Sequence, residues 1–188
     1  MNSRLFYGSS NLPNGDAYLF ADTALAEKWR IKLSRQNKPM VGLVCSGSVG
    51  HKDDRYRSVD LKNLMEALPP GPDYILLQKE IRHTDQVVLE SRQDIEEYSE
   101  HLTNFSETAA LICNLDMVVS VDTSVAHLAG ALGKKTAVML PHLADWRWFS
   151  NRTDSPWYNS VKLCRQKGHG NWDSVFSQVR DEIKLLKY

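Results

Sequence analysis

The segment 117–133 constrains the fold more than any other segment. An apolar run is followed there by a polar turn and then by a stretch rich in small residues. Residues 117–121 are apolar on both faces and rich in valine, which is typical of a strand buried in a parallel sheet. Asp122, Thr123 and Ser124 follow, and these residue types favour the N-terminal cap of a helix. Alanine and glycine recur over 126–131, so that helix can pack close to a sheet. We therefore expect a strand, a tight turn and a helix, the unit of parallel α/β sheets.

The same turn predicts an anion site. The first turn of a helix presents free amide groups and the positive end of the helix dipole, and the Thr123 and Ser124 hydroxyls add donors. His127 lies three residues after Ser124, so both side chains are expected on one side of that turn. A phosphate is the ligand we expect here. A plain helix cap with a packed histidine fits the same residues, since capped strand-to-helix turns occur throughout α/β proteins.

Composition narrows the class of protein. A chain of 188 residues can form one domain with a sizeable core. Lysine plus arginine and aspartate plus glutamate number 23 each, so no overall field indicates nucleic-acid or membrane-surface binding. Cys45, Cys113 and Cys164 lie far apart in apolar segments, which predicts reduced core cysteines and neither a disulfide nor a metal site. Since we find neither a signal sequence nor an apolar run of about 18 residues, we expect a cytoplasmic protein without a membrane span.

Strand-like and helical patterns alternate, which predicts an α/β fold with a single Rossmann-like, doubly wound parallel sheet of about six strands. Strands are expected at 41–45, 74–77, 95–98, 117–121, 136–140 and 161–164. Helices are expected at 22–35, 61–68, 84–89, 106–113, 124–132 and 173–186, with Asp22 and Ser106 as caps. Residues 46–58 are expected to form a long polar loop. Residues 1–20 lack periodicity and are expected to be a loose lead-in to one domain over 21–188.

In a sheet of this kind, ligands bind at the carboxyl ends of the strands. Small, hydroxyl and basic residues follow several predicted strands, and this set suits a diphosphate or nucleotide better than a metal or a simple carboxylate. They are Ser46, Gly47, Lys52, Arg55 and Arg57, then Gln78 and Lys79, and then Asp122, Thr123, Ser124 and His127. The basic loop contains neither GxxxxGK[ST] nor GxGxxG, and a solvated charged turn is its plainer interpretation. Trp146 and Trp148 fit a stacking wall or, more commonly, the core and surface of a rigid loop.

Taken together, the motifs resemble a known family. They occur in order at Val41–Val44, Ser46–Gly47, Lys52–Ser58, Leu77–Lys79, Ala109–Ile112, Val121–Gly133, Asp145–Trp148, Ser155–Tyr158 and Gly170–Asp173. The chain from about Tyr18 to Leu186 resembles the C-terminal glycosyltransferase region of bacterial tetratricopeptide-repeat proteins. That region is related to glycosyltransferase family nine, the lipopolysaccharide heptosyltransferases. The resemblance implies the C-terminal, nucleotide-sugar-binding half of a GT-B enzyme.

The resemblance also implies roles for individual residues. The diphosphate-binding turn falls on Asp122, Thr123, Ser124 and His127. Arg55 or Arg57 corresponds to the basic residue that faces the diphosphate, and the longer loop here leaves both open. Groups near the donor sugar or phosphate fall on Gln78 and Lys79. The nucleobase pocket falls on Phe105, Ser106, Glu107 and Thr108.

The function implied is transfer of a sugar from a nucleoside diphosphate sugar. Basic residues (Arg55, Arg57 and Lys79) and the helix amides would stabilise the departing diphosphate, so no metal or other cofactor is expected. His127 is expected to donate to a phosphate oxygen, and Asp122 to cap the helix. In GT-B enzymes the acceptor site and the usual base belong to the other half, which this sequence lacks, so a partner domain or second copy is expected. The alternative is a catalytically inactive nucleotide-binding or protein-interaction module.

Overall fold

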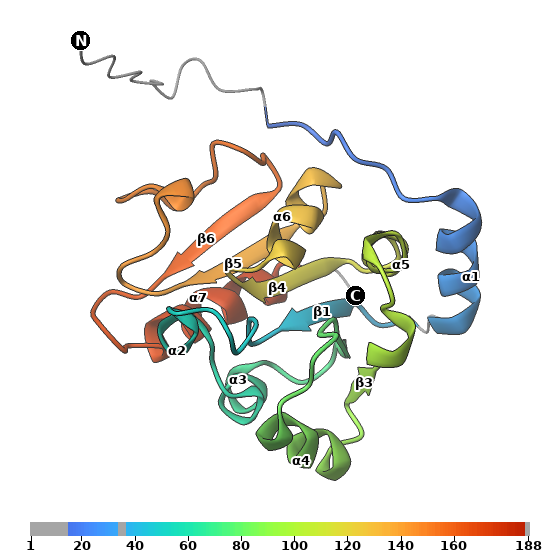
Figure 1. Ribbon diagram of the computed structural model, residues 1–188, viewed down its shortest axis with the longest axis horizontal. Helices are drawn as coiled ribbons and strands as arrows, with labels where there is room; N and C mark the ends of the chain where they lie inside the picture. The colour runs from blue at the N-terminus through green and yellow to red at the C-terminus, as the bar shows by residue number, and fades with distance from the viewer. Residues whose placement is uncertain (1–14, 34–36, 187–188) are drawn as a thin grey trace.

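Figure 1 shows the computed structural model, which describes residues 15–33 and 37–186. Within those residues the strands form one six-stranded sheet, and every neighbouring pair is parallel. The strands are β1 (Met40–Val44), β2 (Asp73–Leu76), β3 (Ile95–Glu97), β4 (Met117–Val121), β5 (Thr136–Leu140) and β6 (Val161–Arg165). Their order, β3-β2-β1-β4-β5-β6, is that of a doubly wound sheet, so the predicted fold class is confirmed.

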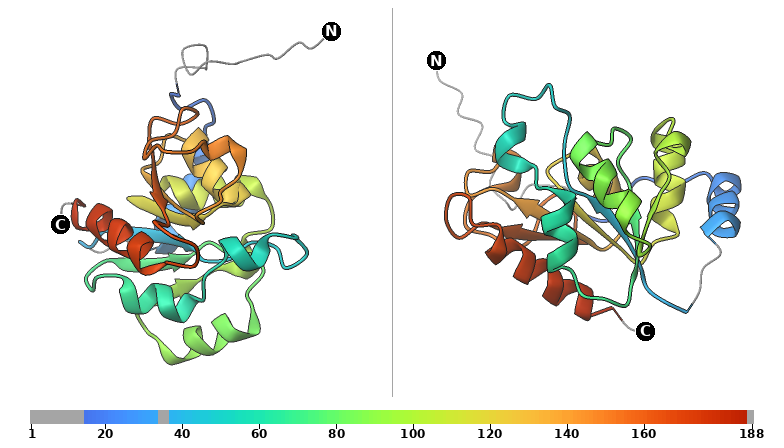
Figure 2. Two further views of the ribbon diagram at one scale, coloured as in Figure 1. Left: turned by 90° about the vertical axis from the view of Figure 1, so that its left-hand side faces the viewer. Right: turned by 90° about the horizontal axis from the view of Figure 1, so that it is seen from below.

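Helices cover both faces of the sheet (Figure 2). They are α1 (Thr23–Leu33), α2 (Asp54–Arg57), α3 (Leu61–Ala67), α4 (His83–Ser91), α5 (Phe105–Cys113), α6 (Ser124–Ala131) and α7 (Asp173–Lys184), with short 3₁₀ turns η2 (Ser99–His101) and η3 (Trp146–Trp148). Helices α3 and α7 pack together on one face, whereas α5 and α6 lie on the other and α1 packs against α5. None of the helices in the described ranges is apolar over enough residues to cross a bilayer.

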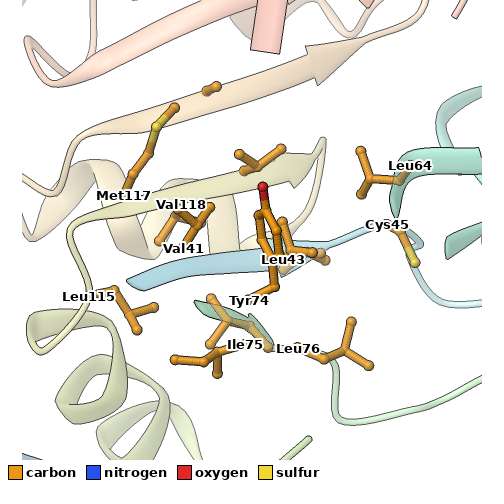
Figure 3. Close-up of a cluster of buried hydrophobic side chains, with 14 of the residues drawn as sticks. Val41, Leu43, Cys45, Leu64, Tyr74, Ile75, Leu76, Leu115, Met117 and Val118 are labelled. Carbon is orange, nitrogen blue, oxygen red and sulfur yellow. The ribbon is translucent and has the colours of Figure 1, made fainter. Parts of the chain in front are cut away.

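The core lies on both sides of the central strands. Every residue of β1, β4 and β5 is buried, as expected for inner strands of a parallel sheet covered on both faces. Leu43 of β1 pairs with Leu76 of β2 and with Val119 of β4, so apolar side chains form continuous rows across the sheet. Figure 3 shows part of this cluster, including Leu43, Leu76 and Leu115. This packing fixes the strand ends that carry the polar turns.

Three local predictions are wrong. The loop 46–58 contains a helical turn, α2. Helix α5 begins one residue earlier than expected, and its cap is Asn104: the Asn104 side chain accepts from the amides of Ser106 and Glu107 at 2.9 and 3.0 Å. Ser106 is therefore inside the first turn and is not the cap. Cys113 is exposed at the end of α5, whereas Cys45 and Cys164 are buried as expected.

The prediction of a loose lead-in is wrong for residues 15–20, which we call the N-terminal strap. The amides of Tyr18 and Leu19 donate to the carbonyl of Ala131, at the end of α6, at 2.9 and 3.1 Å. The carbonyl of Gly15 accepts from the amide of Asn159 at 2.8 Å. The strap is thus hydrogen-bonded to the domain at both of its ends. Residues 1–14 of the predicted lead-in lie outside the described residues.

Candidate functional site

Two cavities meet at the switch point of the sheet. There β1 and β4 are neighbours, and the chain continues from β1 to one face of the sheet and from β4 to the other face. The α5-side lobe, of about 500 Å³, lies beyond the ends of β1, β2 and β4 and reaches the start of α5. The β5-side lobe, of about 770 Å³, lies between α2, the start of α6 and the segment after β5. Thr123 and Ser124 line both lobes. A crevice at this place is where ligands bind in open α/β sheets.

The start of α6 separates the two lobes. Thr123 is the N-cap residue, but its side chain makes no capping hydrogen bond, and its hydroxyl lies 3.1 Å from the Ser120 hydroxyl. The first hydrogen bond of the helix runs from the amide of Ala126 to the carbonyl of Thr123 at 3.1 Å. The amides that precede Ala126 are the usual unpaired donors of a helix start. They adjoin both lobes, so an anion placed between the lobes would meet them.

Asp122 does not cap α6, contrary to expectation. Its carbonyl accepts a hydrogen bond from Arg57 Nη1 at 2.8 Å. Its carboxylate lies 3.9 Å from His127 Nε2, measured from Oδ1. Asp122 therefore joins the β1 loop to β4 through its backbone and faces the histidine through its side chain.

His127 lines the β5-side lobe, and two aromatic side chains hold its ring. Its Nδ1 lies 3.1 Å from the Tyr158 hydroxyl, and its ring stacks on Trp148 with 4.8 Å between centroids. Burial lowers the pKa of His127, and nearby Arg147 adds to this, while Asp122 and Asp145 oppose it in part. The imidazole is therefore neutral near neutral pH. Trp148 is fully buried and Trp146 is 68% exposed, so these residues form the core and the surface of a loop.

The lowered pKa of His127 predicts a pH-dependent contribution to stability. Between the folded pKa and the unfolded value near 6.5, the unfolded chain binds more protons, so stability falls as the pH falls through this range. We expect His127→Asn to lose less unfolding free energy than the wild type between about pH 7.5 and about pH 5. Chemical denaturation at both pH values measures this. His83→Asn, at an exposed position, is the control. A His127→Asn variant with the wild-type pH dependence would contradict the prediction.

The structure separates the two arginines that the sequence left open. Arg57 lines the β5-side lobe and is largely buried, with 17% of its side chain exposed. Arg55 stacks on the ring of Tyr56, to whose hydroxyl it also donates, and it lines a different cavity between α3 and α7. Arg57 is therefore the arginine that faces the cleft, and Arg55 is not placed there.

A buried network that the sequence did not reveal holds Arg57. Asp54, 8% exposed, lies 3.8 Å from Arg57 Nε and pairs with Arg82. Arg82 also donates to the carbonyl of Gly47 at 3.2 Å, which ties the β1 loop to the segment after β2. A side chain at Gly47 would place its Cβ 2.3 Å from Arg57 Nη2, so the glycine makes room for the guanidinium. The loop sequence is polar and charged, so it does not indicate that these side chains are buried.

Gln78 supports the site from behind. It is 5% exposed, and its carbonyl oxygen accepts from the amides of Cys45 and Ser46 at 2.7 and 3.1 Å. Its NH₂ group donates to the Ser46 hydroxyl at 2.9 Å. Gln78 borders the α5-side lobe, but these bonds use its amide to hold the turn after β1. Gln78 therefore holds the turn after β1, and its expected contact with a ligand stays a prediction.

The remaining predicted residues divide between the cleft and its surroundings. Ser46, Gly47 and Lys79 line the α5-side lobe, whereas Lys52 lies on an exposed turn and lines neither lobe. Phe105, 61% exposed, and Thr108 line the α5-side lobe. Ser106 and Glu107 do not line it. Glu107 instead accepts from the indole of Trp29 at 2.8 Å, because α1 packs against this side of α5.

The titratable groups of the described ranges include no cluster of three or more histidine, cysteine, aspartate or glutamate side chains arranged to hold a metal ion. The positive groups that line the two lobes are Arg57, Lys79, Arg147 and the start of α6.

Comparison with known proteins finds a partial family match and two similar solved structures. The family model of glycosyltransferase family 9 (heptosyltransferase) matches residues 101–140, which include α5, β4 and α6. The fold is similar to that of E. coli ADP-heptose lps heptosyltransferase II, with a TM-score of 0.52, 16% identity and coverage of 88% of this chain and 52% of that chain. It is also similar to glycosyl transferase family 9 from Veillonella parvula, with a TM-score of 0.59, 11% identity and coverage of 94% and 48%.

A sequence relative extends the comparison. Protein FlbA of Caulobacter vibrioides is 22% identical over 179 residues, which cover 92% of this chain and 30% of FlbA. The chain thus spans about half the length of the two solved structures and less of FlbA. The single parallel sheet with its flanking helices is thus similar in fold to about half of each of these two solved structures.

Proposed function

We propose that this chain is the nucleotide-sugar-binding domain of a GT-B glycosyltransferase. The observation that carries the proposal is the convergence of Arg57, His127 and the start of α6 on a two-lobed cleft at the switch point. The similarity to family 9 structures supports it at the level of the fold. We further propose that the domain is related to the C-terminal region of tetratricopeptide-repeat proteins and that it acts in the cytoplasm.

The two lobes suggest how a nucleoside diphosphate sugar would lie. The nucleobase would enter the α5-side lobe beside Phe105 and Thr108, and the diphosphate would lie at Thr123 and Ser124. The sugar would then extend into the β5-side lobe, which polar side chains line. This placement puts the charged part of the donor at the start of α6, where unpaired amides favour an anion.

The chemistry would be displacement at the anomeric carbon with the nucleoside diphosphate as leaving group. Negative charge grows on the diphosphate as the glycosidic bond breaks, and Arg57 and the α6 amides are positioned to stabilise it. Neutral His127 would add a hydrogen bond without a second positive charge. These groups supply the stabilisation without a metal ion, so we propose that none is required.

The base for the acceptor would come from a second domain or a partner. In the β5-side lobe, burial alone would raise the pKa of Asp145, but hydrogen bonds from Arg147 outweigh it and hold that pKa below its usual value. A general base works best with a pKa near the working pH. Asp145 is therefore poorly suited to the role. The second candidate is a nucleotide-binding module that transfers nothing and would need no such base.

Titration calorimetry with UDP, GDP and ADP tests the proposal. We expect one of them to bind with a Kd on the order of micromolar, equally well with and without EDTA. Absence of binding by all three would contradict the proposed function. Incubation with the matching nucleotide sugar tests the second candidate. Slow release of the nucleoside diphosphate would support a transferase domain and contradict a module that transfers nothing.

A further inference from the structure

Tyr158 lies directly behind His127 in the second hydrophobic cluster of the domain. It is 8% exposed, and its hydroxyl is 3.1 Å from His127 Nδ1. Its ring packs on Gly130 of α6 so closely that a Cβ there would lie 2.5 Å from the ring. The tyrosine is therefore fixed against the same helix that carries the histidine, one turn further along.

The N-terminal strap reaches this tyrosine from outside. Tyr18 stacks on Tyr158 with 6.5 Å between ring centroids. Burial raises the pKa of Tyr158, so its hydroxyl keeps its proton. Because the amide of Tyr18 donates to the carbonyl of Ala131, the strap cannot move away from α6 without breaking a backbone hydrogen bond.

The surroundings of the imidazole decide which nitrogen carries the proton. Its Nε2 faces the Asp122 carboxylate at 3.9 Å, and an ionised carboxylate only accepts hydrogen bonds. A proton on Nε2 is therefore favoured, and Nδ1 is left as an acceptor. The Tyr158 hydroxyl then donates to Nδ1. Arg147 and Asp145, from the segment after β5, are the other charged groups that act on this ring.

We propose that Tyr158, supported by Tyr18, is a positioning residue that holds His127 in the tautomer with its proton on Nε2. The Nε2–H then lies on the side of Asp122, in the lobe where the phosphate of a donor would arrive. This last step rests on the proposed function, whereas the tautomer itself is a property of the free protein. The strap thus acts on the site through two tyrosines without entering the cleft.

Nuclear magnetic resonance of the ligand-free full chain, labelled with ¹⁵N histidine, tests the tautomer at a pH where His127 is neutral. We expect the Nε2–H form to dominate in the wild type. Tyr158→Phe removes one hydrogen bond to Nδ1, and we expect the ratio of Nε2–H to Nδ1–H to fall by about 3- to 10-fold. The matched control is Tyr74→Phe, because the Tyr74 hydroxyl donates to the Pro69 carbonyl, at the amino end of β2. It should leave the ratio unchanged.

Tyr18→Ala, which removes the ring that stacks on Tyr158, keeps the test decisive if Tyr158→Phe folds poorly, because Tyr18 is 60% exposed. It should shift the ratio in the same direction by a smaller factor. A dominant Nδ1–H form in the wild type, or an unchanged ratio in the folded variants, would overturn the proposal. Titration of the wild type with nucleotides tests the proposed function separately. If the tautomer shifts while the wild type binds no nucleotide, the positioning role stands and the proposed function fails.

Discussion

Arg57→Ala is expected to weaken nucleoside diphosphate binding by about 10- to 100-fold, the usual effect of losing a hydrogen bond to a charged group. Arg57 faces the β5-side lobe and bonds the Asp122 carbonyl, so it both meets an incoming diphosphate and fixes the turn before α6. Arg55→Ala is the matched control. It removes the same charge two residues away, where the side chain stacks on Tyr56 and lines another cavity.

Calorimetric titration of both variants with the nucleotide that the wild type binds measures this difference. Arg55→Ala should stay within about twofold of the wild type, apart from a weak effect of net charge. Arg57→Lys keeps the charge but not the two-pronged guanidinium, and an intermediate affinity is expected. Equal losses in the two alanine variants would mean that the arginines act only through charge. Full affinity in Arg57→Ala would remove this residue from the proposed site.

The second large effect is expected on stability. Trp148 is fully buried, so Trp148→Ala should lower the free energy of unfolding by about 3 to 5 kcal/mol, the usual cost of emptying a large aromatic site. Trp146→Ala is the control two residues earlier. Its side chain is 68% exposed, and a change within about 0.5 kcal/mol is expected.

Urea denaturation followed by circular dichroism measures both values. Trp148→Phe serves if the alanine variant does not fold, because the smaller ring keeps part of the contact with His127 and should cost about 1 to 3 kcal/mol. Similar losses for Trp146→Ala and Trp148→Ala would contradict the buried position of Trp148. A loss below about 1 kcal/mol for Trp148→Ala would do so as well.

The sheet was predictable because each inner strand carries its own local signal. The runs 117–121 and 136–140 are apolar on both faces, and the structure buries all of their residues. The N-terminal cap of α5 was harder to predict. Asn104 and Ser106 are both good capping residues, and only the backbone conformation decides between them. Local pattern therefore fixes which elements form more firmly than where each begins.

The site was predictable only in part. The turn 122–124 and His127 follow from one continuous motif, and the structure places them at the cleft. The choice between Arg55 and Arg57 depends on the path of a loop, which a run of charges does not encode. Tyr158 contacts His127 from 31 positions along the chain, a separation that no local pattern reveals. Contacts of this kind arise only once the sheet has brought distant segments together.

The meeting of the two lobes at Thr123 and Ser124 has a consequence for ligand design. A nucleoside monophosphate and a sugar phosphate would each fill one lobe and would compete for the same amides. The joined molecule satisfies both lobes with a single anionic centre, and the second half binds at the high effective concentration that a short covalent link provides. If the proposed function holds, fragments of a nucleoside diphosphate sugar should therefore bind far more weakly than the intact molecule, and rigid linkers should bind better than flexible ones.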